Sequence, residues 1–298
     1  MLMGISNNST QCTLARPAVI AGPGLFHGVD CRVRLLPAAE NTGIIFRRVD
    51  LASRPEIRAH VDYVVPGSRR TILAANGATV ETVEHLLSAL AGLRVDNCIV
   101  ELSARELPAL DGSSLPFCEA ILEAGMNQQT ALRRTVCIAE LQRISEPANG
   151  QWIECIPSFT DDLVIDYLLD YGSESALPSQ SWAVQVTPEM YLREIAAART
   201  FVMAAEVEAL QAAGYGRHLT GRDLVVFRAD GTVVDNRLRW SNEPVRHKIL
   251  DCIGDLALSG RNFMGRIVAR RSGHKLNHVM AEFLSTIENS VKILSRAA

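Results

Sequence analysis

The chain has no paired cysteines, no long hydrophobic run and no secretory signal. Its seven cysteines include no Cys-x-x-Cys pair, which predicts reduced thiols and excludes a disulfide framework. No apolar run of about 18 residues occurs, so no segment is predicted to cross a membrane. The polar stretch 1–10 lacks the basic and apolar parts of a signal peptide. We therefore expect a cytoplasmic protein.

The sequence also lacks a large excess of charge of either sign. The formal net charge is −3, which gives no electrostatic reason to expect binding to nucleic acid or to an anionic membrane surface. Hydrophobic residues make up 48% of the chain and charged residues 21%, which is typical of a globular protein with a substantial core. The 298 residues suffice for two ordinary domains or one large domain.

A helix is predicted over residues 242–256. Pro244 fits its first turn, where a missing N–H costs little. His247 and Asp251 are four residues apart, so they lie on one side of the helix and could both bind a divalent ion such as zinc. The same spacing also occurs in ordinary surface ion pairs. Apolar residues recur at helical spacing in this stretch: Val245, Ile249, Leu250, Ile253 and Leu256.

A second predicted helix, over residues 82–93, carries Glu84 and His85 near its start. Catalytic zinc normally takes three protein ligands and leaves a fourth position open, with a carboxylate nearby to move a proton. His85, His247 and Asp251 could supply these ligands, and Glu84 could be the base. Alternatively, His85 is a hydrogen-bonded core residue and Glu84 only stabilises its helix through the dipole.

Five stretches of the sequence carry a resemblance to a known family. They are residues 82–86 (Thr-Val-Glu-His-Leu), 107–117 (Leu-Pro-Ala-Leu-Asp-Gly-Ser-Ser-Leu-Pro-Phe), 198–201 (Ala-Arg-Thr-Phe), 245–251 (Val-Arg-His-Lys-Ile-Leu-Asp) and 272–277 (Ser-Gly-His-Lys-Leu-Asn). In type and order they resemble the UDP-3-O-acyl-N-acetylglucosamine deacetylases, metal-dependent amidases of lipid A biosynthesis in Gram-negative bacteria. The resemblance implies hydrolysis of the substrate's N-acetyl group, giving UDP-3-O-acyl-glucosamine and acetate.

The resemblance also implies a cofactor and a substrate. Zinc suits a site of two histidines and one aspartate, and ferrous iron would suit the same ligands. The partner is a small nucleotide-sugar substrate with an acyl chain, which requires an apolar channel. We expect the protein to be a monomer.

The same resemblance implies roles for further residues. His274 would stabilise the oxyanion or protonate the leaving amine, with Asp255 orienting and charging it. Thr200 would support the oxyanion opposite the metal. Phe201 would line the sugar or nucleotide site, and Lys248 would meet the diphosphate end of the substrate.

The pattern of elements favours an α+β fold with two duplicated domains, 1–128 and 129–298. In each half, strands come first and a helix–strand–helix unit follows. His85 and His247 each stand seven residues before a glycine. In the resembling family the active site lies between the helical layers of the two domains. We expect a linker over 127–134, a loop over 173–181 and a closing helix over 280–295.

Two places depart from the pattern of the family. The family has Gly-Leu-His-Thr-Gly near its N-terminus, whereas residues 24–28 read Gly-Leu-Phe-His-Gly, so His27 is displaced by one position. The stretch 214–223 also differs, which could change how substrate is held. His278 has no counterpart among the family's site roles, and we expect it on the surface. Two alternatives remain: a metalloamidase acting on another N-acetylated sugar, and a non-catalytic protein that binds a nucleotide sugar or acyl chain.

Overall fold

A computed structural model describes residues 9–133, 135–158, 162–173, 175, 177–221 and 223–287 of the chain. It has the α+β architecture expected from the sequence. The first half contains β1 (Thr10–Leu14), β2 (Ala18–Pro23), β3 (Asp30–Pro37), β4 (Ile44–Arg48), β5 (Glu56–Arg58), the 3-10 turn η1 (Val61–Tyr63), β6 (Val64–Val65), β7 (Ile72–Ala75), β8 (Ala78–Glu81), α1 (Glu84–Gly92), β9 (Cys98–Leu102), α2 (Leu115–Ala124) and β10 (Met126–Leu132).

The second half is built from a similar succession of elements. It contains β11 (Thr135–Cys137), β12 (Gln142–Glu146), the 3-10 turn η2 (Pro147–Asn149), β13 (Gln151–Ile156), β14 (Leu163–Leu169), β15 (Gln180–Gln185), α3 (Pro188–Met190), the π-helical turn η3 (Tyr191–Ile195), β16 (Phe201–Met203), α4 (Ala204–Ala212), β17 (Val225–Phe227), α5 (Glu243–Ala257), β18 (Asn262–Arg270) and α6 (His274–Thr286).

The two halves contain sheets with the same strand order. The first sheet runs β2-β3-β9-β4-β5, and the second runs β12-β13-β18-β14-β15, with β11 also paired to β18. In each sheet the late strand, β9 or β18, is antiparallel to one neighbour and parallel to the other. This correspondence is what a duplication would leave, and we propose a duplication as its origin.

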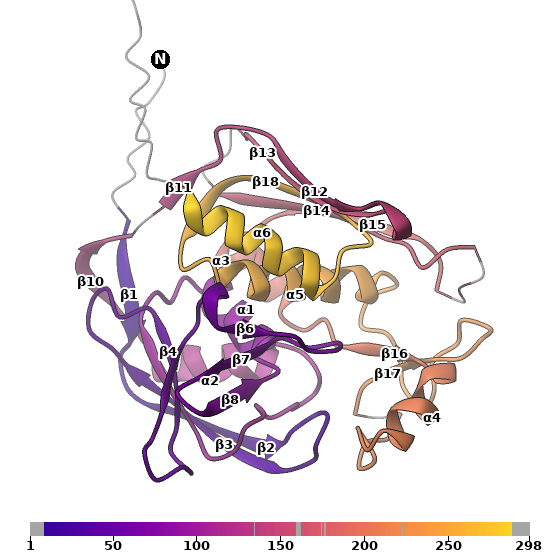
Figure 1. Ribbon diagram of the computed structural model, residues 1–298, viewed down its shortest axis with the longest axis horizontal. Helices are drawn as coiled ribbons and strands as arrows, with labels where there is room; N and C mark the ends of the chain where they lie inside the picture. Colours follow the sequence, from indigo (N-terminus) through magenta and orange to yellow (C-terminus); the bar gives the residue numbers. More distant parts are fainter. Residues whose placement is uncertain are drawn as a thin grey trace, which may run out of the picture.

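Alternating burial in the strands explains why helices cover only one face of each sheet. In β3, Cys31, Val33 and Leu35 are buried while the residues between them are exposed. A strand places successive side chains on opposite faces, so this pattern gives one apolar face and one exposed face. Figure 1 shows α1, α5 and α6 lying between the sheet that contains β18 and the sheet that contains β3. The helices of the two halves therefore face each other in the middle of the molecule.

Helices α1 and α5 approach each other closely at Gly254. A Cβ atom at this position would lie 2.1 Å from the backbone oxygen of Glu84, far inside any real contact. Only glycine permits this approach, which brings the start of α1 against the C-terminal part of α5. Helix α5 is buried along nearly all of its length, because it packs on α1, α6 and β14.

The structure corrects several expectations about single elements. The segment expected as a linker over 127–134 is largely strand β10, which pairs with β1. Helix α6 begins at His274, not at residue 280, and the part expected beyond 287 lies outside the described residues. Strand β15 begins inside the loop expected over 173–181.

Two expectations about the whole chain can also be compared with the structure. Among the described residues, no helix is both long and apolar enough to cross a membrane. All seven cysteines are free thiols, as their spacing predicts.

Candidate active site

The three predicted metal ligands come together where α1 meets α5. His85 lies in the first turn of α1, and His247 and Asp251 lie one turn apart on α5. One ligand atom from each lies within 4.8 Å of the others, and all three residues are buried. Nε2 of His247 is 3.4 Å from Oδ1 of Asp251, and Nε2 of His85 is 3.7 Å from the same oxygen.

The hydrogen bonding of these side chains fits a divalent cation. Oδ1 of Asp251 is buried and has no hydrogen-bond partner among the described residues, which is costly for a carboxylate unless a cation lies beside it. Its other oxygen accepts from Lys248 Nζ at 2.8 Å. Nδ1 of His247 lies 3.0 Å from the Ala198 carbonyl oxygen. A carbonyl only accepts, so Nδ1 carries the proton and Nε2 presents its lone pair to the cluster, as in metal-binding histidines.

The protonation states of the cluster also suit a metal. Burial lowers the pKa of His247 to about 4, so its imidazole is neutral near pH 7. Burial raises the pKa of Asp251, but His247 and Lys248 outweigh it and hold that pKa well below its usual range. A neutral imidazole and an ionised carboxylate are the forms that bind metal.

Glu84 lies beside this cluster as a buried carboxylate. Its Oε2 accepts a hydrogen bond from the backbone N–H of Thr71 at 3.1 Å. Burial raises the pKa of Glu84, partly offset by His274 and His85. A raised pKa suits a carboxylate that both accepts and returns a proton.

A strained turn places Glu84 and His85 at the start of α1. Thr82 has a φ of 59°, which is unusual for a β-branched residue. The turn is held by Thr82 N donating to Thr71 O at 3.0 Å and by Ser114 Oγ donating to His85 O at 2.8 Å. Strain of this kind is common where a fold fixes reacting groups.

One turn further along the same face of α5, Asp255 is buried and forms a hydrogen-bonded pair with the largely buried His274. Nδ1 of His274 lies 2.8 Å from Oδ2 of Asp255, which also accepts from Asn277 Nδ2 at 2.9 Å. Burial lowers the pKa of His274, but Asp255 outweighs it and raises that pKa to about 9. His274 is therefore an imidazolium near neutral pH, with its Nε2 proton available.

The expectation that His278 lies on the surface is wrong. Its side chain is 15% exposed, and its Nε2 lies 3.4 Å from Oδ1 of Asp255 and 2.9 Å from Oγ1 of Thr71. The i, i+4 spacing of His274 and His278 on one helix could have revealed that they share a face. Thr71 was missed altogether, because no local pattern marks a threonine whose partners are far along the chain.

Asp255, His274 and His278 form a second group with metal-ligand geometry, but their hydrogen bonds argue against a metal there. Both oxygens of Asp255 already accept hydrogen bonds, one of them from Thr71 at 2.6 Å. The unpartnered carboxylate oxygen that marks the first cluster is absent from this second group among the described residues.

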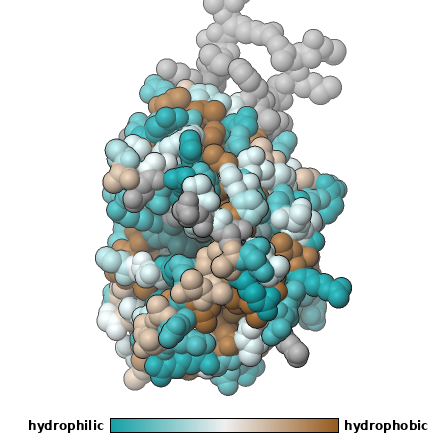
Figure 2. Space-filling model, turned by 90° about the vertical axis from the view of Figure 1, so that its right-hand side faces the viewer, coloured by the Kyte–Doolittle hydropathy of each residue, from teal (hydrophilic) through white to brown (hydrophobic). Residues whose placement is uncertain are grey.

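Phe201 lies at the edge of the metal cluster, and Thr200 precedes it in the chain. The Phe201 ring centroid is 6.3 Å from that of His247 and 6.2 Å from that of Tyr171. Thr200 is fixed by its backbone N–H, which donates to Gly112 O at 2.8 Å. Figure 2 views the side of the molecule that carries β16, α4 and β17 and shows apolar surface gathered on it. Tyr171, 53% exposed, contributes an open apolar edge beside Phe201.

The two departures from the family pattern lie in contact with each other. Gly216 N donates to Phe26 O at 2.9 Å. The Tyr215 ring meets those of Phe26 and His27 edge-on, at centroid distances of 5.6 and 5.7 Å. Nε2 of His27 lies 3.1 Å from Glu81 Oε2, so the displaced histidine is engaged in an ion-pair network of the first half.

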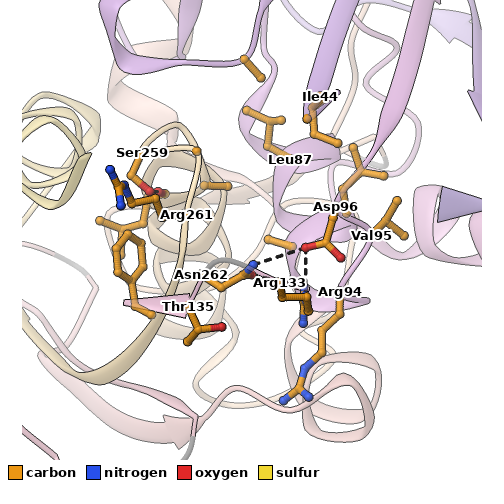
Figure 3. Close-up of a pocket in the computed structure, with 18 of the residues that line it drawn as sticks. Ile44, Leu87, Arg94, Val95, Asp96, Arg133, Thr135, Ser259, Arg261 and Asn262 are labelled. Carbon is orange, nitrogen blue, oxygen red and sulfur yellow. Dashed lines mark hydrogen bonds and ion pairs between the residues drawn. The ribbon is translucent and has the colours of Figure 1, made fainter. Parts of the chain in front are cut away.

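A cavity of about 470 Å³ lies between the two halves, but away from this cluster. Leu87 and Leu90 line it from α1, and Leu256 lines it from α5. Figure 3 shows Arg133 and Asn262 directed at Asp96 on its wall. None of the predicted site residues lines it, so the donor set, not cavity size, identifies the candidate active site.

Two histidines and an aspartate gathered in one buried cluster, with a carboxylate beside them, are the side chains typical of metal-dependent hydrolases. Comparison with known proteins agrees with this class. The family described as UDP-3-O-acyl N-acetylglycosamine deacetylase matches residues 11–286. Proteins named UDP-3-O-acyl-N-acetylglucosamine deacetylase from Brucella melitensis and Brucella ovis are each 35% identical over 288 residues, covering 96% of this chain and 99% of the relative. The chain belongs to this deacetylase family.

Proposed function

We propose that this protein hydrolyses the N-acetyl group of UDP-3-O-acyl-N-acetylglucosamine, releasing acetate and leaving the free amine, a step of lipid A biosynthesis. The observation that carries the proposal is the unpartnered Oδ1 of Asp251 between two histidines, next to the buried carboxylate of Glu84. Family membership supplies the substrate class.

His85, His247 and Asp251 would hold the metal, which we propose to be zinc, with ferrous iron possible for the same ligands. When bound, such an ion polarises the acetyl carbonyl and acidifies water. Lys248 donates to the outer oxygen of Asp251, which leaves the inner oxygen directed at the cluster. Lys248 is therefore engaged with a ligand, and we propose that it also meets the diphosphate end of the substrate.

The remaining side chains divide the proton transfers between them. Glu84 accepts the proton of the attacking water. His274, charged and oriented by Asp255, stabilises the oxyanion or donates a proton to the leaving amine. We propose that Thr200 supports the oxyanion from the side opposite the ligands.

The acyl chain of the substrate requires an apolar surface to bind. We propose that Phe201 contacts the sugar and that the neighbouring apolar edge at Tyr171 receives the acyl chain. We also propose a monomer in the cytoplasm with domains 1–128 and 129–298. The corresponding order of strands in the two sheets supports two domains. The boundary at 128 falls within β10, which pairs with β1 of the first half.

The test is acetate release by metal-reconstituted protein from UDP-3-O-acyl-N-acetylglucosamine, compared with UDP-N-acetylglucosamine and free N-acetylglucosamine. We expect turnover of the acylated nucleotide sugar and little of the other two. Preference for a sugar that lacks the acyl chain would contradict the substrate assignment. Binding of substrate without any turnover would favour a non-catalytic protein.

A further inference from the structure

We infer that Thr71 is a positioning residue that ties Glu84 to the Asp255–His274 pair, with His278 setting the direction of its hydroxyl. The inference rests on the proposed function and deepens it. It assigns roles to Thr71 and His278, to which the family resemblance gave none.

Thr71 contacts Glu84 and Asp255, the hydrogen-bond partner of His274, at once. Its backbone N–H donates to Glu84 Oε2 at 3.1 Å, and its Oγ1 donates to Asp255 Oδ1 at 2.6 Å. The residue is fully buried. One residue of the first half therefore joins a carboxylate of α1 to a carboxylate of α5.

The direction of the hydroxyl proton follows from its partners. Nearby His274 and His278 outweigh the burial of Asp255 and lower its pKa, so this carboxylate is ionised and can only accept. The Thr71 hydroxyl must then donate to it, which leaves a lone pair of Oγ1 facing His278 Nε2 at 2.9 Å. That nitrogen carries its proton toward Thr71. The hydrogen-bonded chain thus runs from His278 through Thr71 to Asp255 and on to His274.

The backbone of Thr71 is as constrained as its side chain. Its carbonyl accepts from Thr82 N at 3.0 Å, just before Glu84. Thr71 therefore contacts the strained turn before α1 through its carbonyl, and Glu84 at the start of α1 through its N–H. Its side-chain partners, Asp255 and His278, lie 184 and 207 residues further along the chain.

This arrangement has a direct consequence for catalysis. Glu84 comes from one half of the molecule and His274 from the other, yet both must act on the N-acetyl group of the substrate. A displacement of about 1 Å in such groups can cost roughly a hundredfold in rate. Thr71 fixes their spacing through one short link, so its hydroxyl should affect turnover more than substrate binding.

The test compares Thr71→Val, which keeps the shape and the backbone N–H, with Thr71→Ser, which keeps the hydroxyl. We expect Thr71→Val to lower kcat by roughly tenfold to a hundredfold, with KM within about twofold and unchanged metal content. Thr71→Ser should retain kcat within about threefold of the wild type. His278→Ala should lower kcat in the wild type but add little in the Thr71→Val background.

Several results would overturn the inference. A Thr71→Val enzyme with normal kcat would do so. Thr71→Ser being as slow as Thr71→Val would also do so, since a retained hydroxyl would then fail to preserve turnover. A raised KM at normal kcat would assign Thr71 to substrate binding instead.

A measurement without substrate separates this inference from the proposed function. In the unfolding of Thr71→Val, Asp255→Asn and the double variant, we expect strongly non-additive effects. Additive effects in an enzyme that releases acetate would overturn the inference about Thr71 alone. A wild type that releases no acetate despite coupled unfolding would overturn the proposed function, and the catalytic role of Thr71 with it.

Discussion

Asp251 and Asp255 are one helical turn apart on α5, yet their surroundings give them different chemistry. Asp251 keeps one buried oxygen without a hydrogen-bond partner among the described residues, as a metal ligand should. Asp255 has both oxygens bound by donors from Thr71, His274 and Asn277. The first carboxylate suits a cation, and the second suits the orientation of an imidazolium.

The charge on His274 predicts a pH dependence that can be measured. Its folded pKa is about 9, above the ordinary value of 6.5. The stability that this pairing contributes is therefore complete below about pH 6.5 and is lost as the pH rises through about 9. Activity that needs the imidazolium should fall over the same upper range. Asp255→Asn should move the alkaline limb of kcat to lower pH, because the charge that raises the pKa is gone.

The control for this pH profile is Asp62→Asn, which removes an acid beside the less buried His60. This variant should keep the alkaline limb of the wild type. An alkaline limb that stays in place in Asp255→Asn would contradict the assignment to His274.

At the residue scale, the sequence could predict which side chains gather in the proposed metal cluster, but not the contacts that surround them. His247 and Asp251 share a helix, so their proximity follows from spacing alone. The approach of His85, and the roles of Thr71 and His278, depend on how α1 and α6 pack against α5. Long-range packing of this kind leaves no local signal in one sequence.

At the scale of elements, the site depends on the close approach of α1 and α5. Gly254 makes this approach possible, since a Cβ there would lie 2.1 Å from the Glu84 backbone oxygen. The two helices of the proposed site were placed correctly because their apolar spacing is strong, whereas the closing helix begins six residues earlier than expected. Strand β10 was missed because it is polar and mostly exposed. Its strand partner among the described residues, β1, is more than a hundred residues away.

Gly254→Ala tests the importance of this approach. A glycine-to-alanine change inside an ordinary helix stabilises it by about 1 kcal/mol. Here we expect the opposite sign, a loss of about 1–3 kcal/mol in the free energy of unfolding, because α1 must move away from α5. His85 would move with α1, so affinity for the metal should also fall. A variant with increased stability and unchanged metal affinity would show that the helices do not need this contact.

At the scale of the whole molecule, the metal would join the two halves, since His85 belongs to one half and His247 and Asp251 belong to the other. A ligand that binds only the folded state stabilises it by about 4 kcal/mol at a thousandfold excess over Kd. We therefore expect a chelator to lower Tm and added zinc to restore it. The resemblance predicted an active site between two halves, whereas the matching strand orders became visible only in the structure.

Two alanine variants test whether the expected rise in Tm comes from metal bound at this cluster. His85→Ala should lose the metal-dependent rise in Tm, whereas His60→Ala, a change outside the cluster, should retain it. A metal-dependent rise that persists in His85→Ala would show that the two halves are not joined through this site.

The most direct test of the account compares the wild type with Glu84→Gln for bound metal and for acetate release. Glutamine keeps the shape of the side chain but cannot accept the proton, so we expect one bound metal per chain in both proteins and turnover lower by about a hundredfold or more in the variant. This result would separate the base from the three ligands. Loss of metal from Glu84→Gln, or turnover close to that of the wild type, would contradict it.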